Sequence, residues 1–241
     1  MGPLEGSGCP GPAGRELANV VALWVRYRAA VDLTMRLILI RHGESEGNAS
    51  GVIQGRVDFG LSPTGVLQAR ATAGYVATLE VDRVVTSPLR RAADTAETIA
   101  GPLGHGVVHM PALMEYDIGE ASGLSGAELR QRFPEVFTAY STGRRPTFPG
   151  EEGRDTFHDR LQAALGEFSA MEGTTVAVAH GGVISSLCHI VVGLDIQRPG
   201  AFHVGNCSIT EVVRDRAGRL VLARHNDTCH LRGLETFADR G

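Results

Sequence analysis

The chain has 241 residues, of which 43% are hydrophobic and 21% are charged, and its formal net charge is -4. This length is enough for one sizeable hydrophobic core, so the sequence does not require a second domain. The slightly acidic balance argues against a surface for nucleic acid or for an anionic membrane, so we expect neither as a partner.

The first 34 residues differ in composition from the rest of the chain. Residues 2–14 contain five Gly and three Pro, which predicts a flexible tail. Residues 15–33 favour a helix whose apolar stretch is too short to span a bilayer, and they lack the flanks of a signal peptide. We predict an N-terminal extension over residues 1–34 and one domain over residues 35–241, with a membrane-surface or partner helix as the alternative for the extension.

Strand and helix patterns alternate along the predicted domain, which favours an α/β three-layer sandwich with a mostly parallel sheet and helices on both faces. Ser62-Pro63 and Ser87-Pro88 each place a capping hydroxyl before a proline, and Ser125 with Glu128 offers a capping box. In chain order we expect strand 36–40, helix 63–79, strand 82–87, helix 88–101, strand 106–109, helix 152–171, strand 174–179, helix 181–194, and a hairpin of strands 206–214 and 219–225.

Two buried strands end in a histidine. The apolar residues 37–40 run directly into Arg41 and His42, and residues 176–179 run into His180. The carboxyl ends of neighbouring parallel strands meet at one edge of a sheet, where helix N-termini point at ligands. Because an arginine beside histidines suits phosphate, the sequence predicts a phosphate site at this edge.

Five segments, in a fixed order, carry a further signal: Arg41-His42-Gly43-Glu44-Ser45-Glu46-Gly47-Asn48, Gln54-Gly55, Ser87-Pro88-Leu89-Arg90-Arg91-Ala92, Leu113-Met114-Glu115 and Ala179-His180-Gly181-Gly182. Together they resemble the histidine phosphatase superfamily, the phosphoglycerate-mutase-like enzymes, over roughly residues 36–213. The resemblance implies a phosphoglycerate-mutase-like fold and catalysis by phosphoryl transfer to a histidine.

By this resemblance His42 is the nucleophile, and its second ring nitrogen is expected to bond a backbone carbonyl of its own loop. Arg41, Arg91 rather than Arg90, and a protonated His180 are expected to bind phosphate. Glu115 is expected to protonate the leaving group and then to activate water, with Asp117 as its nearest rival. The expected catalytic set is therefore His42, Glu115, Arg41, Arg91 and His180.

The expected substrate-binding set adds Asn48, Gln54, Gly55 and Gly181 to Arg41, Arg91 and His180. For Asn48 a capping or turn role is the alternative. Arg144 and Arg145 can meet a second acidic group of the substrate, although a solvated loop is the preferred interpretation. Glu151 and Glu152 resemble a further family segment, but we expect no catalytic role for them. No metal or cofactor is expected, because the two histidines lack a supporting cluster of carboxylates or cysteines.

Three functions stay open at this point. The preferred one is a metal-independent phosphomonoesterase that acts on a small phosphorylated metabolite; a phosphoglycerate-type mutase and a non-catalytic phospho-ligand binding module are the alternatives. Gly182 stands where the mutases carry an asparagine, and only 65 positions separate Glu115 from His180. Both features favour the phosphatases. The four scattered cysteines predict reduced thiols in a cytoplasmic protein, and a homodimer remains an option.

Overall fold

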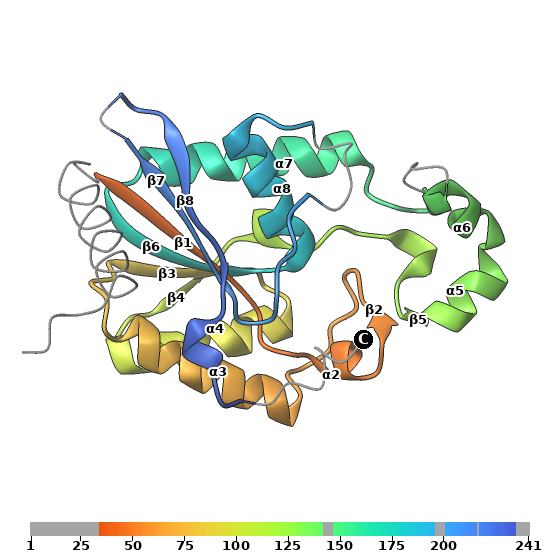
Figure 1. The fold of residues 1–241 in the computed structure, drawn as a ribbon, viewed down its shortest axis with the longest axis horizontal. Coiled ribbons are helices and arrows are strands. Elements are labelled where there is room, and N and C mark those ends of the chain that lie inside the picture. The colour runs from red at the N-terminus through yellow and green to blue at the C-terminus, as the bar shows by residue number, and fades with distance from the viewer. Residues whose placement is uncertain (1–33, 142–146, 196–200, 216, 235–241) are drawn as a thin grey trace, which may run out of the picture.

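A computed structural model describes residues 34–141, 147–195, 201–215 and 217–234 (Figure 1). Six strands form the central sheet, in the order β4-β3-β6-β1-β7-β8. Their bounds are β1 Met35–Arg41, β3 Arg83–Thr86, β4 Val107–His109, β6 Gly173–Ala179, β7 Ile209–Arg214 and β8 Leu220–Asp227.

Four of these strands run parallel, and the last two close the sheet as an antiparallel hairpin. β6 pairs in parallel with both β1 and β3, and β3 pairs in parallel with β4. β7 runs antiparallel to β1 and pairs with β8. The α/β sandwich with a mostly parallel sheet is therefore confirmed. The register places Arg41 opposite Ala179, so His42 and His180 follow neighbouring strands at the same edge.

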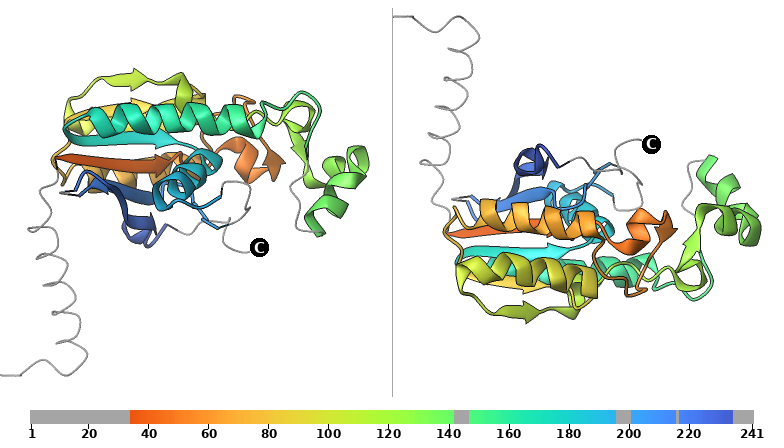
Figure 2. Two further views of the ribbon diagram at one scale, coloured as in Figure 1. Left: turned by 90° about the horizontal axis from the view of Figure 1, so that it is seen from above. Right: turned by 90° about the horizontal axis from the view of Figure 1, so that it is seen from below.

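Long helices cover both faces of the sheet (Figure 2). They are α3 Pro63–Val76, α4 Arg90–Leu103, α7 Arg154–Ala170 and α8 Gly181–Val192. Alternate residues of β1 point to opposite faces. Leu37 and Leu39 pack in the cluster that contains α7 and α8, whereas Ile38 and Ile40 pack in the cluster that contains α3 and α4. Burial on both faces explains why β1 is an uninterrupted apolar run.

Shorter elements extend beyond the carboxyl ends of the parallel strands, at the right of Figure 1. A two-stranded sheet joins β2 and β5, and the hydrophobic residues of α5 and α6 pack with Ala121 in a small core of their own. The bounds are α2 Glu46–Ala49, β2 Val52–Ile53, η2 Gly119–Ala121, β5 Leu124–Ser125, α5 Gly126–Arg132 and α6 Pro134–Ser141. Two further short helices, η1 Pro111–Leu113 and η3 Cys229–Leu231, contact α7 and α3 instead.

Two of the three predicted helix caps are confirmed. Ser62 accepts a hydrogen bond from the Gly65 N–H with Pro63 in the first turn, and Ser125 forms a full capping box with Glu128. The cap predicted at Ser87 is wrong, because α4 begins at Arg90 and its N-cap residue, Leu89, has no side-chain bond. The Ser87 hydroxyl contacts His180 instead.

The predicted helices and strands are found with their ends shifted by at most a few residues. The proposed N-terminal extension lies outside the described residues, as do Arg144 and Arg145. Within the ranges that the structure describes, no helix is long and apolar enough to cross a membrane.

Candidate active site

Two imidazole rings lie side by side where β1 and β6 end. The ring centroids of His42 and His180 are 5.2 Å apart, and the rings are tilted by 58°. Both residues are buried, at 3% and 0% exposure. The arrangement follows from the parallel pairing of the two strands, because each histidine is the first residue after its strand.

His42 has the form of a neutral nucleophile. Its Nδ1 lies 2.6 Å from the carbonyl oxygen of Gly43, which confirms the predicted bond to its own loop. A carbonyl oxygen only accepts, so Nδ1 carries the proton and the lone pair stays on Nε2. Burial, helped by the positive charges of Arg41 and Arg91, holds the pKa of His42 well below 6.5.

The loop that carries His42 is fixed by groups far away in the sequence. The Gly43 N–H donates to Thr95 Oγ1 at 3.1 Å. Asn206 Nδ2 donates to the His42 carbonyl at 3.0 Å, and the Cys207 N–H donates to the carbonyl of Arg41, also at 3.0 Å. Asn206 and Cys207 are not among the residues that the sequence predicts for the site.

Two guanidinium groups flank the histidines, that of Arg91 buried and that of Arg41 half-buried. Arg41 Nη1 donates to the Val204 carbonyl at 2.7 Å. Arg91 donates from Nη1 to the carbonyl of Val57 at 2.8 Å and from Nη2 to that of Gly55 at 2.9 Å. Arg91 is 1% exposed, whereas the Arg90 side chain is largely exposed and faces Asp94.

Burial lowers the pKa of both Arg41 and Arg91, and the charge of Glu115 raises it. Both groups remain charged, because arginine is not deprotonated in proteins. Within the described part of the chain, Nε of Arg41, Nε of Arg91 and Nδ1 of His180 are buried without a hydrogen-bond partner. Buried polar atoms are normally paired, so three unpaired nitrogens around two imidazoles indicate a place for an anion.

His180 is held by the serine that was expected to cap a helix. Its Nε2 lies 2.8 Å from Ser87 Oγ, and His180 itself is the N-cap residue of α8. Burial, together with the repulsion that a proton on His180 would meet from His42, Arg91 and Arg41, holds the pKa of His180 well below 6.5. These effects disfavour the protonated His180 expected from the sequence, unless an anion lies beside it.

Glu115 reaches the same site from the loop after η1. Its Oε1 accepts from the Tyr116 N–H at 2.8 Å, and its Oε2 accepts from the Gly182 N–H at 3.0 Å. A Cβ at Gly182 would collide with Oε1 of Glu115. The glycine in the first turn of α8 therefore leaves room for the carboxylate.

Comparison with known proteins decides the family. The family model for the histidine phosphatase superfamily, branch 1, matches residues 37–228. The chain belongs to this superfamily. A relative described as putative phosphoserine phosphatase 2, from Hydrogenobacter thermophilus, is 32% identical over 83% of this chain and 98% of its own length.

Solved structures agree with this assignment. A mycobacterial glucosyl-3-phosphoglycerate phosphatase is 28% identical, covers 80% of this chain and 99% of its own, and superposes with a TM-score of 0.72. The phosphoserine phosphatase of Entamoeba histolytica, solved with 3-phosphoglyceric acid, is 30% identical, covers 82% of this chain and 99% of its own, and also reaches 0.72. The chain is a phosphatase of the histidine phosphatase superfamily.

In this histidine phosphatase Asn48 has the capping role that was considered as its alternative. It completes a capping box with Ser45 at the start of α2. Its Oδ1 accepts from the Ser45 N–H, from Ser45 Oγ and from Asn206 Nδ2, at 3.2, 2.9 and 3.4 Å. The oxygen is thus engaged, and the amide nitrogen is the group left for a ligand.

The remaining predicted binding residues lie around the two arginines. Gln54 Oε1 accepts from Ser45 Oγ at 2.7 Å, and the carbonyl of Gly55 accepts from Arg91. Gly181 is the first residue of α8, and a Cβ there would lie 3.6 Å from Arg41 Nε. A helix N-terminus at this point adds its positive end to the site.

Behind Glu115 the histidine phosphatase has an ionic network that the motifs do not predict. Arg56 Nε and Arg160 Nη2 both donate to the Glu115 carbonyl, each at 3.2 Å. Glu152 bridges the two arginines, at 2.5 Å from Arg160 Nε and 3.1 Å from Arg56 Nη2. Glu152 stands in a segment that resembles one of the family's sequence segments. No sequence pattern around Arg56 or Arg160 indicates that either residue belongs to the site. The network fixes the backbone from which the Glu115 carboxylate extends.

Proposed function

We propose that this phosphatase hydrolyses small phosphorylated metabolites through a phosphohistidine on His42, without a metal, and with Glu115 as the proton donor and acceptor. The observation that carries the proposal is the set of three buried nitrogens without partners, on Arg41, Arg91 and His180, around a neutral His42. The relatives named above act, by their names, on phosphoserine and on glucosyl-3-phosphoglycerate.

The first step transfers the phosphoryl group to the enzyme. The lone pair on His42 Nε2 attacks phosphorus while the bond from phosphorus to the ester oxygen breaks. Arg41 and Arg91 hold the charge that spreads over the equatorial oxygens, which replaces the role of a metal cation. Glu115, in its protonated form, delivers its proton to the departing alkoxide, so that the product leaves as an alcohol.

The second step returns the enzyme to its starting state. The Glu115 carboxylate takes a proton from a water molecule whose oxygen attacks phosphorus. The bond between phosphorus and Nε2 then breaks, and the electron pair returns to the imidazole. The charge of a bound phosphate favours a proton on His180, which would then offer Nδ1–H to the anion.

The proposal is tested by trapping the intermediate. Wild-type protein mixed with a labelled phosphomonoester and quenched should carry acid-labile phosphate, and His42→Ala should carry none and should show no turnover. Labelling and turnover that persist in His42→Ala would refute the nucleophile. Activity should survive EDTA, and a loss that added metal restores would refute metal independence.

The two alternative functions predict different products. A phosphatase releases free phosphate from 3-phosphoglycerate, whereas a mutase yields 2-phosphoglycerate instead. A binding module would bind phosphomonoesters and release nothing. Phosphate release and isomer formation measured on the same sample separate the three.

A further inference from the structure

One short segment, Gly55-Arg56-Val57, contacts both the phosphate-binding arginine and the loop of the proposed acid. The carbonyls of Gly55 and Val57 accept from the guanidinium of Arg91, at 2.9 and 2.8 Å. The residue between them, Arg56, donates from Nε to the backbone carbonyl of Glu115 at 3.2 Å. Neighbouring residues of one segment therefore bond two groups that have to meet at the same phosphate ester.

The segment is held in place without the side chain of Arg56. The next residue, Asp58, accepts through Oδ1 from the Arg90 N–H at 2.6 Å, at the start of α4. Gly55 has a positive φ of 51°, and a Cβ there would come within 2.7 Å of Ile118 and of Ser122. Because these contacts and the two bonds to Arg91 do not involve the Arg56 guanidinium, a change of that side chain should leave the segment where it is.

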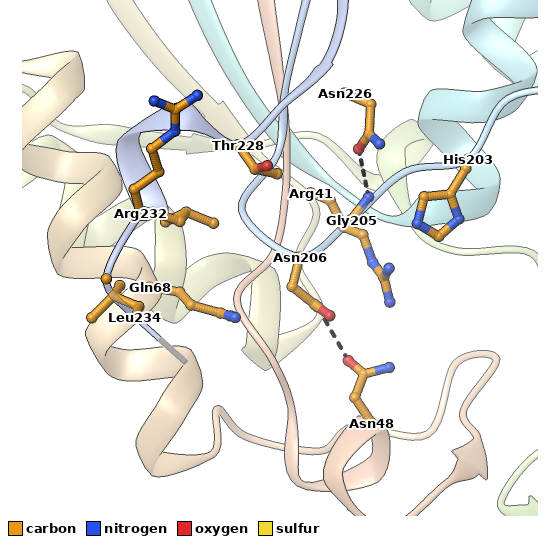
Figure 3. A pocket seen from close by; sticks show the side chains of 12 residues that line it. Arg41, Asn48, Gln68, His203, Gly205, Asn206, Asn226, Thr228, Arg232 and Leu234 are labelled. Atoms are coloured by element: carbon orange, nitrogen blue, oxygen red, sulfur yellow. Dashed lines mark hydrogen bonds between the residues drawn. The ribbon is translucent and has the colours of Figure 1, made fainter. Parts of the chain in front are cut away.

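The guanidinium of Arg56 is occupied by protein groups. Beside the bond from Nε, Nη2 lies 3.1 Å from a carboxylate oxygen of Glu152, and Nη1 lies 3.7 Å from one of Asp117. The cavity beside the nucleophile loop, drawn in Figure 3, is lined by neither Arg56 nor Glu115. Each nitrogen of Arg56 thus faces an acceptor of the protein, which is typical of a residue that holds others in place and not of one that binds substrate.

The carbonyl of Glu115 receives a second bond from another direction. Arg160 donates from Nη2 to this carbonyl at 3.2 Å and from Nη1 to the carbonyl of Ala112 at 2.6 Å. A carbonyl oxygen has two lone pairs, so both are used. The bond from Arg160 ties the acid loop to α7, whereas the bond from Arg56 ties it to the segment that contacts Arg91.

We propose that Arg56 is a positioning residue, which sets the place of the Glu115 carboxylate relative to the phosphate that Arg91 binds. The proposal rests on the proposed function, in which Glu115 is the acid, and adds the residue that couples this acid to the phosphate site. Glu152 supports the role, because it holds Nη2 of Arg56. An acid must come within about 2.6 to 3.2 Å of the oxygen that it protonates, so a small shift of its backbone weakens proton transfer.

The test variant is Arg56→Met, which removes the guanidinium and keeps an unbranched apolar stem. It is assayed by kcat/KM on phenyl phosphate and on p-nitrophenyl phosphate, whose leaving group needs less help from a proton. A misplacement of 1 Å can cost about 10²-fold, so kcat/KM for phenyl phosphate should fall about tenfold or more. For p-nitrophenyl phosphate the loss should stay below about threefold. The Ki of inorganic phosphate should not change, because Arg41, Arg91 and His180 keep their places.

Arg132→Met is the matched control. Arg132 lies in α5 and forms an exposed ion pair with Glu120 at 2.8 Å, so the control also removes one paired arginine. It should leave both kcat/KM values and the Ki of phosphate as they are.

A double-mutant cycle with Glu115→Gln distinguishes positioning from a general structural role. If Arg56 acts through the acid, Arg56→Met should cause little further loss on phenyl phosphate once Glu115 is glutamine, since coupled residues are not additive. A residue that only supports the fold would add its own full loss in the double variant.

The outcomes separate this proposal from the proposed function. Equal losses on the two substrates in Glu115→Gln would refute the acid, and the role of Arg56 would fall with it. If Glu115→Gln slows phenyl phosphate selectively, the positioning role alone is overturned by an Arg56→Met that changes neither substrate, slows both equally or adds its full loss in the double variant. Should a thermal melt show that Arg56→Met is unfolded, Glu152→Gln, which keeps its size and loses the charge that holds Arg56, decides by the same cycle.

Discussion

Adding one methyl group at Gly182 tests the role of Glu115 without touching that residue. The new Cβ of Gly182→Ala would overlap with Oε1 of Glu115 and would come within 3.1 Å of Cδ. Ordinary contact requires the carboxylate to move by roughly 1 Å, and a misplacement of that size can cost about 10²-fold in rate. The whole contribution of a general acid, about 10² to 10⁴, is the upper limit.

The assay for Gly182→Ala uses leaving groups of different quality. Alkyl phosphates need a proton on the departing oxygen, so their kcat/KM, which reports the first step and not the common second one, should fall by about 10²-fold, whereas that of p-nitrophenyl phosphate should change much less. Gly166→Ala is the matched control, because Gly166 lies in α7 and a Cβ there meets nothing within 4 Å. It should leave both rates as they are and raise stability by about 0.5 to 1 kcal/mol.

Equal losses of kcat/KM for aryl and alkyl phosphates in Gly182→Ala would refute an acid role for Glu115. An unchanged kcat/KM for alkyl phosphates would refute it as well. A thermal melt of each variant separates these outcomes from a damaged fold, since the structure predicts that Gly182→Ala moves a side chain and keeps α8 intact.

Three further predictions concern the phosphate-binding residues. Ser87→Ala removes the hydroxyl that holds His180 Nε2, so KM for any phosphomonoester should rise several-fold while kcat changes less; an unchanged KM would contradict it. Arg91→Lys replaces a planar guanidinium, whose separate nitrogens face two carbonyls and the phosphate, by a compact ammonium, so kcat/KM should fall about 10² to 10³-fold. Arg90→Lys should have little effect; equal effects of the two would place the phosphate elsewhere. The pKa values of His42 and His180 are lowered on folding, so the unfolded chain binds more protons below about pH 6.5 and stability falls with acidification. Between about pH 7.5 and 5.5 the two histidines should account for part of the loss of stability, which urea unfolding would show as a smaller loss in the variant with His42→Asn and His180→Asn.

The parts of the site that could be predicted from the sequence are those with a local pattern. A strand buried on both faces is an apolar run, so the two histidines that follow such runs could be placed at one sheet edge from the sequence alone. Glu115 and Arg91 could be identified because they stand in short segments that resemble a family.

The supporting residues could not be predicted, because nothing near them in the sequence marks their roles. Ser87 meets His180 across 93 positions, and Asn206 meets His42 across 164. Ser62-Pro63 and Ser87-Pro88 look alike as dipeptides, yet one caps a helix and the other serves a histidine. The tertiary contact with His180, and not the local sequence, determines that Ser87 does not cap a helix.

The backbone carbonyl of His42 accepts a hydrogen bond from the side chain of Asn206, which the ribosome adds 164 residues after His42. β1 is likewise enclosed only when β6 and β7 have both arrived on its two sides. Contacts of such long sequence separation form late and slowly. A nascent chain that stops before Asn206 can contain His42, both arginines, Glu115 and His180 and still lack the bond that fixes the nucleophile loop, so catalytic competence should emerge only after Asn206 has been added.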